Sequence, residues 1–574
     1  MKKKLVLLTG VAVILAISAS RGWGQTEATK ASEETLEEGI PVTSQLVISK
    51  CGTCHARDQK GNLSRISWER TTPEGWQEAI KRMVRLNGVT LSQSDSRAIL
   101  KYLATYHGLA PEEAKPVMFL AEHRSIDESE APEELRGVCN YCHAYSRALT
   151  WRRPTAEWLM LENMHMAQFI TAEPTFRHSL FLGVSRSNPN APEPGEIAAD
   201  YLGKKAPLHT PEWSAWRARL TAPRLAGRWL LKAYFPGRGK YYGELMIEQG
   251  ASEDEFKTSV KLKSASDGSV LTRTGQSIVY AGYSWRGRSK GSPGTNAAPV
   301  DDLNREAREA LWISPDQNMA EGRWYWGDYQ EFGYDVSLMR ASPEPTIYGV
   351  NISALKTGSK GTQVRLFVDN APARAVVADL DLGAGIKVNR IVSSGSGEVV
   401  VEVDVAADAV SGKRDARFGR STLPNAIAVY DHLDYIKVTP QTALAHLGSQ
   451  THPKGYQQFE AIGYNRGADG KPQTEDDIEL GPVDVTWSVE EFYAIFGDDD
   501  KGFVGHLSPT ALFTPASDGP NPERKFMRNN YGDVWVVATS KTEKDHFGKP
   551  IVGKSYLVVT VPTYMKWDQP EVNP

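Results

Sequence analysis

Two short motifs contain the residues of this sequence that most clearly predict chemistry. Each reads Cys-x-x-Cys-His, as "CGTCH" at 51–55 and "CNYCH" at 139–143, and together they use all four cysteines of the chain. In this pattern two thiols add to the vinyl groups of a c-type haem, and the histidine binds the haem iron. Disulfides would not need the histidines, and zinc would need four converging ligands. The motifs therefore predict two covalently bound haem c groups, with these attachment cysteines and iron-binding histidines: Cys51, Cys54, His55, Cys139, Cys142 and His143.

A tryptophan that precedes each candidate sixth ligand at the same spacing suggests an internal repeat. Trp76 lies seven residues before Met83, and Trp158 lies seven residues before His165. If the two tryptophans are equivalent, Met83 and His165 occupy equivalent positions, and we predict both as iron ligands. Met/His coordination is usual in cytochromes c. A methionine packed in the core of an amphipathic helix is the alternative for Met83.

The sixth ligand of the second iron stays open between several residues. His165 lies in "LENMHMAQF", where Met164 and Met166 are also possible ligands, and His178 follows in a longer insertion. A thioether ligand favours Fe(II) and raises the potential, whereas a second imidazole lowers it. With His165 bound, the two irons would differ and form an ordered electron path. Two fully coordinated irons favour electron transfer over oxygen or peroxide chemistry.

Helical segments follow each motif in the same order, which predicts two tandem cytochrome c modules, at 36–120 and 121–207. In "SDSRAILKYLATYHG", the residues Ile99, Tyr102, Leu103 and Tyr106 recur at helical spacing. The pair Tyr102-Leu103 has a counterpart in the second module, the pair at 201–202.

From about residue 208 the helical periodicity gives way to short alternating segments separated by Gly, Asn, Asp and Pro, such as "FKTSVKLKS" and "GEVVVEVDVAA". These predict antiparallel strands at the spacing of sandwiches or barrels. We therefore expect a multidomain chain: an α-helical dihaem cytochrome c domain at 25–207, an antiparallel β-barrel-like domain at 208–345, and two immunoglobulin-like β-sandwiches at 346–440 and 441–574.

The N-terminus predicts export. Three lysines precede the apolar run "LVLLTGVAVILAISA" and a small-residue exit, which is the pattern of a secretory signal peptide at 1–24. The run is shorter than a spanning helix requires, so we expect no membrane span after cleavage and a periplasmic location. The formal charge of −4 gives no electrostatic reason to expect a nucleic acid partner.

Two kinds of charged segment in the β region have ordinary structural explanations. "GYSWRGRSKGS" at 282–292 is interpreted as a solvated hairpin, although it carries Arg286, Arg288 and Lys290. The acidic stretches at 465–477 and 497–502 do not match the calcium spacing of an EF-hand. Asx-turns account for their aspartates without a metal.

The combination of these features resembles the alpha subunit of bacterial quinohaemoprotein amine dehydrogenase. The resemblance is carried by the two haem motifs, by "GRWLLKAYFPGRGKYYGELMIEQG" at 227–250, by "VYAGYSWRGRS", by "EGRWYWGDYQEFGYDVSLMR", and by "TEDDIELGPVDVTWS" with "DGPNPERKF" and "NNYGDVWVVA" further on. It covers nearly the whole mature chain. The haem motifs are common to all c-type cytochromes, so the specificity comes from their combination with three β domains.

The resemblance implies an oxidoreductase of three subunits in which this chain transfers electrons. The partners would be a propeller-like beta subunit and a small gamma subunit whose cysteine tryptophylquinone oxidises primary amines. A cupredoxin or small cytochrome c would accept the electrons in the periplasm. All four cysteines of this chain are committed to haem, so the thioether-linked quinone must lie in a partner, and we expect no catalytic residue here.

Two other functions are compatible with the motifs. A dihaem cytochrome c peroxidase-like enzyme would need an iron with an open or displaceable position. A non-catalytic cytochrome tethered to adhesion-like β domains would lack any quinone-bearing partner.

Overall fold

The computed structural model describes residues 37–117, 131–140, 145–177, 191–292, 299–395, 397–493 and 497–562. The expected signal peptide and the residues Cys142, His143 and His178 lie outside these ranges. Among the described residues, no helix has the length and apolar character needed to cross a membrane.

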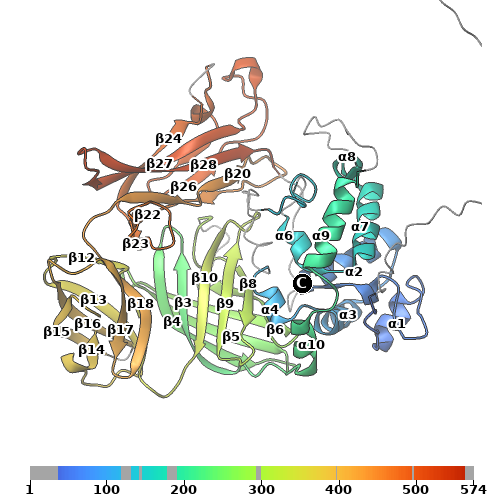
Figure 1. The fold of residues 1–574 in the computed structure, drawn as a ribbon, viewed down its shortest axis with the longest axis horizontal. Helices are drawn as coiled ribbons and strands as arrows, with labels where there is room; N and C mark the ends of the chain where they lie inside the picture. The colour runs from blue at the N-terminus through green and yellow to red at the C-terminus, as the bar shows by residue number, and fades with distance from the viewer. Residues whose placement is uncertain are drawn as a thin grey trace, which may run out of the picture. The chain divides into compact units, whose positions relative to one another are not determined.

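The N-terminal part of the chain is helical (Figure 1). Its helices are α1 (Gln45–Cys51), α2 (Pro73–Asn87), α3 (Gln93–Tyr106), α4 (Pro111–Ala114), α6 (Ser146–Leu149), α7 (Thr155–Gln168), α8 (Ala172–Arg177), α9 (Pro194–Lys205) and α10 (Pro211–Ala218). Ile99 and Leu103 of α3 are buried, as their spacing predicts, but Tyr106 at the end of the helix is exposed. Leu100 and Ala104 complete the buried face instead.

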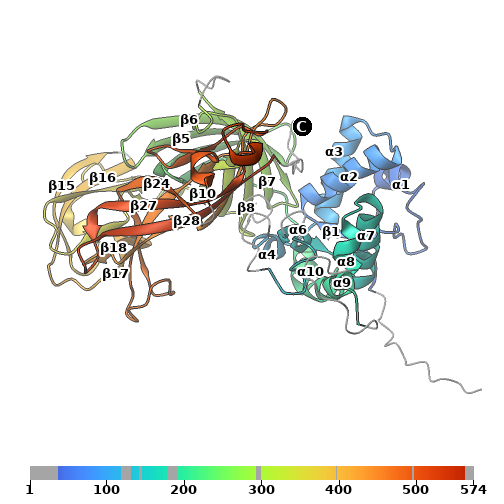
Figure 2. The same ribbon diagram turned by 90° about the horizontal axis from the view of Figure 1, so that it is seen from above.

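Two of these helices are equivalent members of the repeat. Trp76 is the fourth and Met83 the eleventh residue of α2, and Trp158 and His165 have the same positions in α7. A short strand precedes each helix, β1 (Arg70–Thr71) and β2 (Trp151–Arg152), and the two strands pair antiparallel. Figure 2 shows α1, α2 and α3 in one group and α7, α8 and α9 in a second. The repeat inferred from the tryptophan spacing is thus present in the helices.

The central β domain is a closed barrel of eight antiparallel strands, each paired with its neighbours in sequence and the last with the first (Figure 1). The strands are β3 (Gly227–Phe235), β4 (Gly239–Gln249), β5 (Glu255–Ser264), β6 (Val270–Tyr280), β7 (Ser284–Gly291), β8 (Ala307–Ile313), β9 (Met319–Trp326) and β10 (Phe332–Arg340). Strand β5 alternates buried Phe256, Val260 and Leu262 with outward lysines. An eight-stranded barrel has an interior that side chains can fill, and here Trp229, Trp285 and Trp324 help to fill it.

The two remaining β domains are sandwiches of hydrogen-bonded sheets. The first contains β11 (Thr346–Val350), β12 (Ala354–Lys356), β13 (Thr362–Asp369), β14 (Leu380–Asp381), β15 (Ile386–Gly395), β16 (Gly397–Val405), β17 (Gly412–Phe418) and β18 (Ser421–Tyr430). The second contains β19 (Tyr435–Thr439), β20 (Thr442–His446), β21 (Gln457–Gln458), β22 (Glu460–Asn465), β23 (Ile478–Pro482), β24 (Val485–Glu491), β25 (Gly505–Leu507), β26 (Leu512–Pro515), β27 (Gly532–Lys544) and β28 (Pro550–Thr560).

The two sandwiches begin with the same arrangement of strands. In each, the first strand is divided and its second half joins the opposite sheet, as β11 and β12 do in the first sandwich and β19 and β20 in the second. The second half pairs parallel with a late strand, β18 or β28, while all other pairs in these sheets are antiparallel. The expected order, a helical domain followed by a barrel and two sandwiches, is confirmed.

Contacts from the helical domain to the barrel correct one expectation. Arg286 of β7 is not on a solvated hairpin, because its side chain is only 1% exposed and its Nε donates to Glu74 at the start of α2. The hydroxyl of Tyr283 donates to the carbonyl oxygen of Leu109 at 2.9 Å. The sequence places Arg286 and Glu74 more than 200 residues apart, so no local pattern could have revealed the pair.

Candidate haem-binding site

The first motif follows directly from helix α1. The hydroxyl of Ser44 caps this helix by accepting from the Val47 amide, and the helix ends at Cys51. The amides of Cys54 and His55 both donate to the Cys51 carbonyl oxygen, at 3.2 and 2.9 Å, so a tight turn brings both cysteines together. Burial raises the pKa of the Cys51 thiol, and the nearby Cys54 raises it further. A neutral thiol is a poor nucleophile and a poor metal ligand, which disfavours a thiolate function for Cys51.

His55 is oriented by a hydrogen bond on one ring nitrogen. Its Nδ1 lies 2.8 Å from the carbonyl oxygen of Ser64, which can only accept, so Nδ1 carries the proton and donates. The lone pair is then on Nε2. Fixing the tautomer through the nitrogen opposite the metal is the usual arrangement of metal-binding histidines. The Nδ1 hydrogen bond therefore leaves Nε2 as the nitrogen that His55 can offer to an iron.

Met83, the predicted sixth ligand of the first haem, lies in the last turns of α2 and is half-buried. The side-chain amide of Asn87, one turn further on, donates to the Met83 sulfur at 3.7 Å. This contact orients the thioether. Thr72 caps the helix at one end, and Gly88, with a φ of 67°, ends it at the other.

The second motif is described in part. Cys139 is half-buried, and its partial burial raises the pKa of its thiol to about 12. Cys142 and His143 lie outside the described residues. None of the three cysteines that the structure describes is in a disulfide.

The ring of His165 on α7 is oriented by the same kind of hydrogen bond as the ring of His55. Its Nδ1 donates to the Leu161 carbonyl oxygen, one turn back, at 2.9 Å, which leaves the Nε2 lone pair available. Burial lowers the pKa of His165, and the charges of Arg82 and Arg153 lower it further against the opposing effect of that hydrogen bond. The ring is therefore neutral, as a ligand must be. Met164 and Met166 are also half-buried on this helix, so the choice among the three stays a prediction.

Sequence reasoning missed a group of charged residues between these two helices. Arg65, Arg82, Arg153, Glu69 and Glu157 form what we call the arginine cluster. The Arg65 Nε lies 2.7 Å from Glu157, and the Arg153 Nη2 lies 3.3 Å from Glu69. The segments "SWERT" and "TWRRP", which form β1 and β2 and their flanks, could have drawn attention to charged residues beside tryptophans in both modules.

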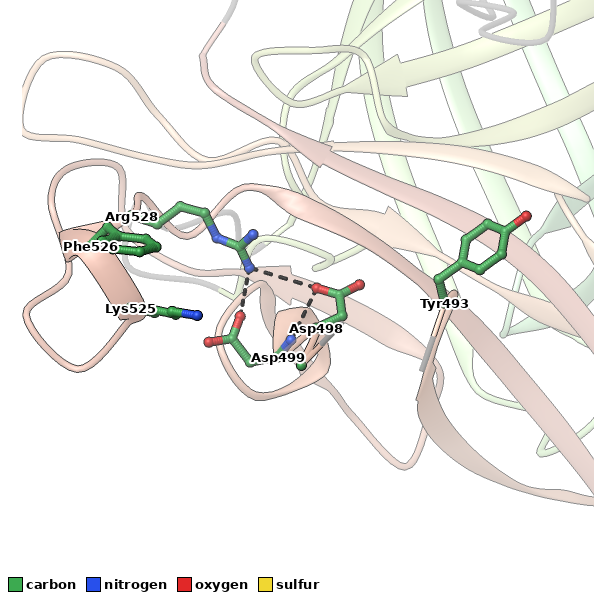
Figure 3. A pocket seen from close by; sticks show the side chains of 7 residues that line it. Tyr493, Asp498, Asp499, Lys525, Phe526 and Arg528 are labelled. Carbon is green, nitrogen blue, oxygen red and sulfur yellow. Dashed lines mark hydrogen bonds and ion pairs between the residues drawn. The ribbon is translucent and has the colours of Figure 1, made fainter. Parts of the chain in front are cut away.

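The acidic stretch at 497–502 lines an open cavity of about 540 Å³ in the last sandwich (Figure 3). Asp498, Asp500 and Asp533 each offer an oxygen within 4.8 Å of the others. Arg524 and Arg528 both bind Asp500, and Arg528 also lies 2.6 Å from Asp499, as Figure 3 shows for the latter pair. Two guanidinium groups already supply the neutralising charge, so this cluster gives no reason to place calcium here.

Comparison with family models agrees with this geometry. Residues 42–186 match the model described as quinohaemoprotein amine dehydrogenase A, alpha subunit, haem binding. Residues 222–341, 344–431 and 436–572 match the models of domains II, III and IV of the same alpha subunit, in the same order as the barrel and the two sandwiches. The chain belongs to the quinohaemoprotein amine dehydrogenase alpha subunit family. Its helical domain is the haem-binding domain of that family, and as an alpha subunit it is one member of an oxidoreductase complex.

Other comparisons add little to this assignment. No curated protein matches this alpha subunit. Among solved structures, a de novo designed fluorescence-activating β-barrel is 20% identical over 20% of this chain and 93% of its own, with a TM-score of 0.16. Human protocadherin-24 EC1-2 is 10% identical over 38% of this chain and 98% of its own, with a TM-score of 0.15.

Proposed function

We propose that this chain is the dihaem electron-transfer subunit of a periplasmic amine dehydrogenase. Two haem c groups are attached through Cys51, Cys54, Cys139 and Cys142. The irons are bound by His55 and Met83 in the first module, and by His143 and His165 in the second. The single observation that supports this most is that His55 and His165, in different modules, both donate from Nδ1 to a carbonyl oxygen, the arrangement that directs Nε2 to a metal.

The equivalence of α2 and α7 supports the ligand assignment. Met83 and His165 occupy the same position of matching helices, each seven residues after a buried tryptophan. Met164 and Met166 point in other directions, since neighbouring residues of an α-helix are about 100° apart around its axis. A Met/His iron and a bis-histidine iron would differ in potential, which orders the path between them.

Two haems match the electron count of amine oxidation. Conversion of a primary amine and water to an aldehyde and ammonia releases two protons and two electrons. Each haem iron takes one electron, from Fe(III) to Fe(II), so the pair holds both electrons of one turnover. The protons leave with solvent or groups of the partner that performs the amine chemistry.

We infer that the amine chemistry is carried by a partner subunit with a cysteine tryptophylquinone. All four cysteines of this chain are in haem motifs, so none is left for the quinone's thioether. A propeller-like beta subunit and the quinone-bearing gamma subunit would complete the complex. A cupredoxin or small cytochrome c would accept the electrons, and the sandwiches would be immunoglobulin-like domains.

Purification from the native host with identification of every copurifying chain by mass tests this proposal. We expect a mature alpha chain that lacks its first 24 residues or so and carries the added mass of two haems, together with a small chain that contains a modified tryptophan. A single haem, or an alpha chain purified without any small quinone-bearing partner, would contradict it.

A further inference from the structure

The arginine cluster contains three arginines but only two glutamates, and Arg153 is its buried arginine, whereas Arg65 and Arg82 are half-buried. Arg153 is only 1% exposed, and Glu69 and Glu157 are 10% and 8% exposed. Three arginines face two glutamates, since Glu78 near Arg82 is already paired with Lys81 at 3.6 Å. An uncompensated buried charge is costly, which indicates that an anion belongs close by.

Unused donors identify where the compensation is incomplete. The Nε and Nη1 of Arg153 and the Nε of Arg82 are buried and have no hydrogen-bond partner among the residues that the structure describes. The Arg153 guanidinium carbon lies 4.1 Å from the Trp151 ring centre and 5.2 Å from that of Trp158, both tryptophans of the second module. These rings face the guanidinium but accept no full hydrogen bond, so among the described residues its charge is compensated chiefly by Glu69 at Nη2.

The arginine cluster also joins the two modules at the helices of the proposed sixth ligands. Arg82 precedes Met83 on α2, while Glu157 lies on α7, the helix of His165. Arg65 of the first module binds Glu157 of the second, and Arg153 of the second binds Glu69 of the first. The arginine cluster therefore links the two helices that carry the candidate iron ligands.

The haems that the two motifs attach would bring anionic groups of their own. Each haem c carries two propionate carboxylates, which remain charged after the vinyl groups have reacted with cysteines. A carboxylate forms strong charge-assisted hydrogen bonds with arginine. The chemistry of the donors thus fits the group that the two motifs attach.

We propose that the arginine cluster is a counter-charge shared by the two haems, which receives propionate carboxylates and shifts the reduction potentials of both irons together. This inference rests on the proposed attachment of two haems. Positive charge near an iron favours the less positive Fe(II) state, so the arginine cluster raises both potentials.

Replacement of Arg82 in the purified complex tests the inference, with each haem potential measured by spectroelectrochemical titration. Arg82→Gln is expected to move both midpoints to lower potential. Arg82→Lys, which keeps the charge, should restore them towards the wild-type values. Arg85→Gln removes an exposed arginine from the same helix and should leave both midpoint potentials unchanged.

If Arg82→Gln shifts the potential of the first haem alone, or of neither haem, the inference of a shared counter-charge is wrong. A merely structural role of Arg82 would lower stability without moving both potentials in the direction of the charge. If Arg82→Gln does not fold with both haems, Glu157→Gln removes a negative charge instead and must move both midpoints upward. Absence of that shift would also overturn the inference.

The mass of the alpha chain separates this inference from the proposed function. A wild-type chain with fewer than two haems contradicts the proposed function. A chain with both haems whose potentials do not respond to Arg82 or Glu157 contradicts only the inference.

Discussion

At the scale of single residues, the chemistry depends on which ring nitrogen or sulfur is presented to an iron. His55 and His165 solve this in the same way, through an Nδ1 hydrogen bond to a backbone carbonyl oxygen. The side-chain amide of Asn87 donates to the Met83 sulfur and orients it in a comparable way. The candidate ligands are thus oriented by hydrogen bonds within their own modules.

Met83→Ala should abolish the thioether-to-iron absorption band of the ferric protein, because no sulfur would then reach the first iron. Covalent attachment should persist, since it depends on the cysteines. Optical spectra of the purified alpha chain check this, with the exposed Met319 on the barrel as a control position. A band that survives the substitution would remove Met83 as a ligand.

His165→Ala should change the spectrum and potential of the second haem and leave those of the first almost unchanged, because only one iron loses its imidazole. Met164→Ala and Met166→Ala, at neighbouring positions of the same helix, are the matched controls. An unaltered second haem in His165→Ala, with a change in one of the methionine variants, would transfer the ligand role to that methionine.

At the scale of elements, buried ion pairs hold the helices of the haem-binding domain in place. Glu113 of α4 accepts two hydrogen bonds from Arg70 of β1, at 2.7 and 2.9 Å, and one from Thr210, the N-cap residue of α10, at 2.7 Å. Arg70 also donates to the carbonyl oxygen of Leu208 at 2.6 Å. This network joins β1, and through it β2 and both modules, to the helices that lead into the barrel.

Glu113→Gln should lower the stability of the haem-binding domain by about 3–5 kcal/mol at neutral pH, the usual cost of breaking a buried ion pair. Burial alone would raise the pKa of Glu113, but the hydrogen bonds and charges of Arg70 and Arg152 outweigh it and hold the pKa at about 2. The stabilisation is therefore present above the ordinary glutamate pKa of 4.5 and is lost as the pH falls from 4.5 towards 2.

Thermal unfolding followed by haem absorbance at a series of pH values checks this prediction. The difference between wild type and Glu113→Gln should narrow below pH 4.5 or so. Glu112→Gln, on the exposed side of the same short helix, should behave like the wild type at every pH. A difference that stays constant across the acid range would contradict the account.

The elements that sequence predicts well are those set by local patterns. The haem motifs, the tryptophan spacing on α2 and α7, and the alternation of strand β5 are all readable within a few residues. Arg286 was misjudged because its partner Glu74 is distant in sequence, and a charged residue on a β hairpin is usually solvated. The arginine cluster could not be predicted for the same reason, since Arg65 and Glu157 belong to different modules.

At the scale of the whole molecule, the chain combines one haem-binding domain with three β domains that carry no motif of their own for redox chemistry. The four family models follow the order of these domains along the chain. The barrel binds the helical domain through Arg286 and Glu74, and through Tyr283. In the proposed function, the electrons travel through the first domain.

Addition of a primary amine to the purified complex, with the haem absorption bands recorded under anaerobic conditions, tests the central claim most directly. The account predicts that the haems of this chain become reduced, with two electrons taken up for each amine oxidised, and that a tertiary amine of the same size has no effect. Haems that stay oxidised with every primary amine offered, yet are reduced at once by a chemical reductant, would contradict it.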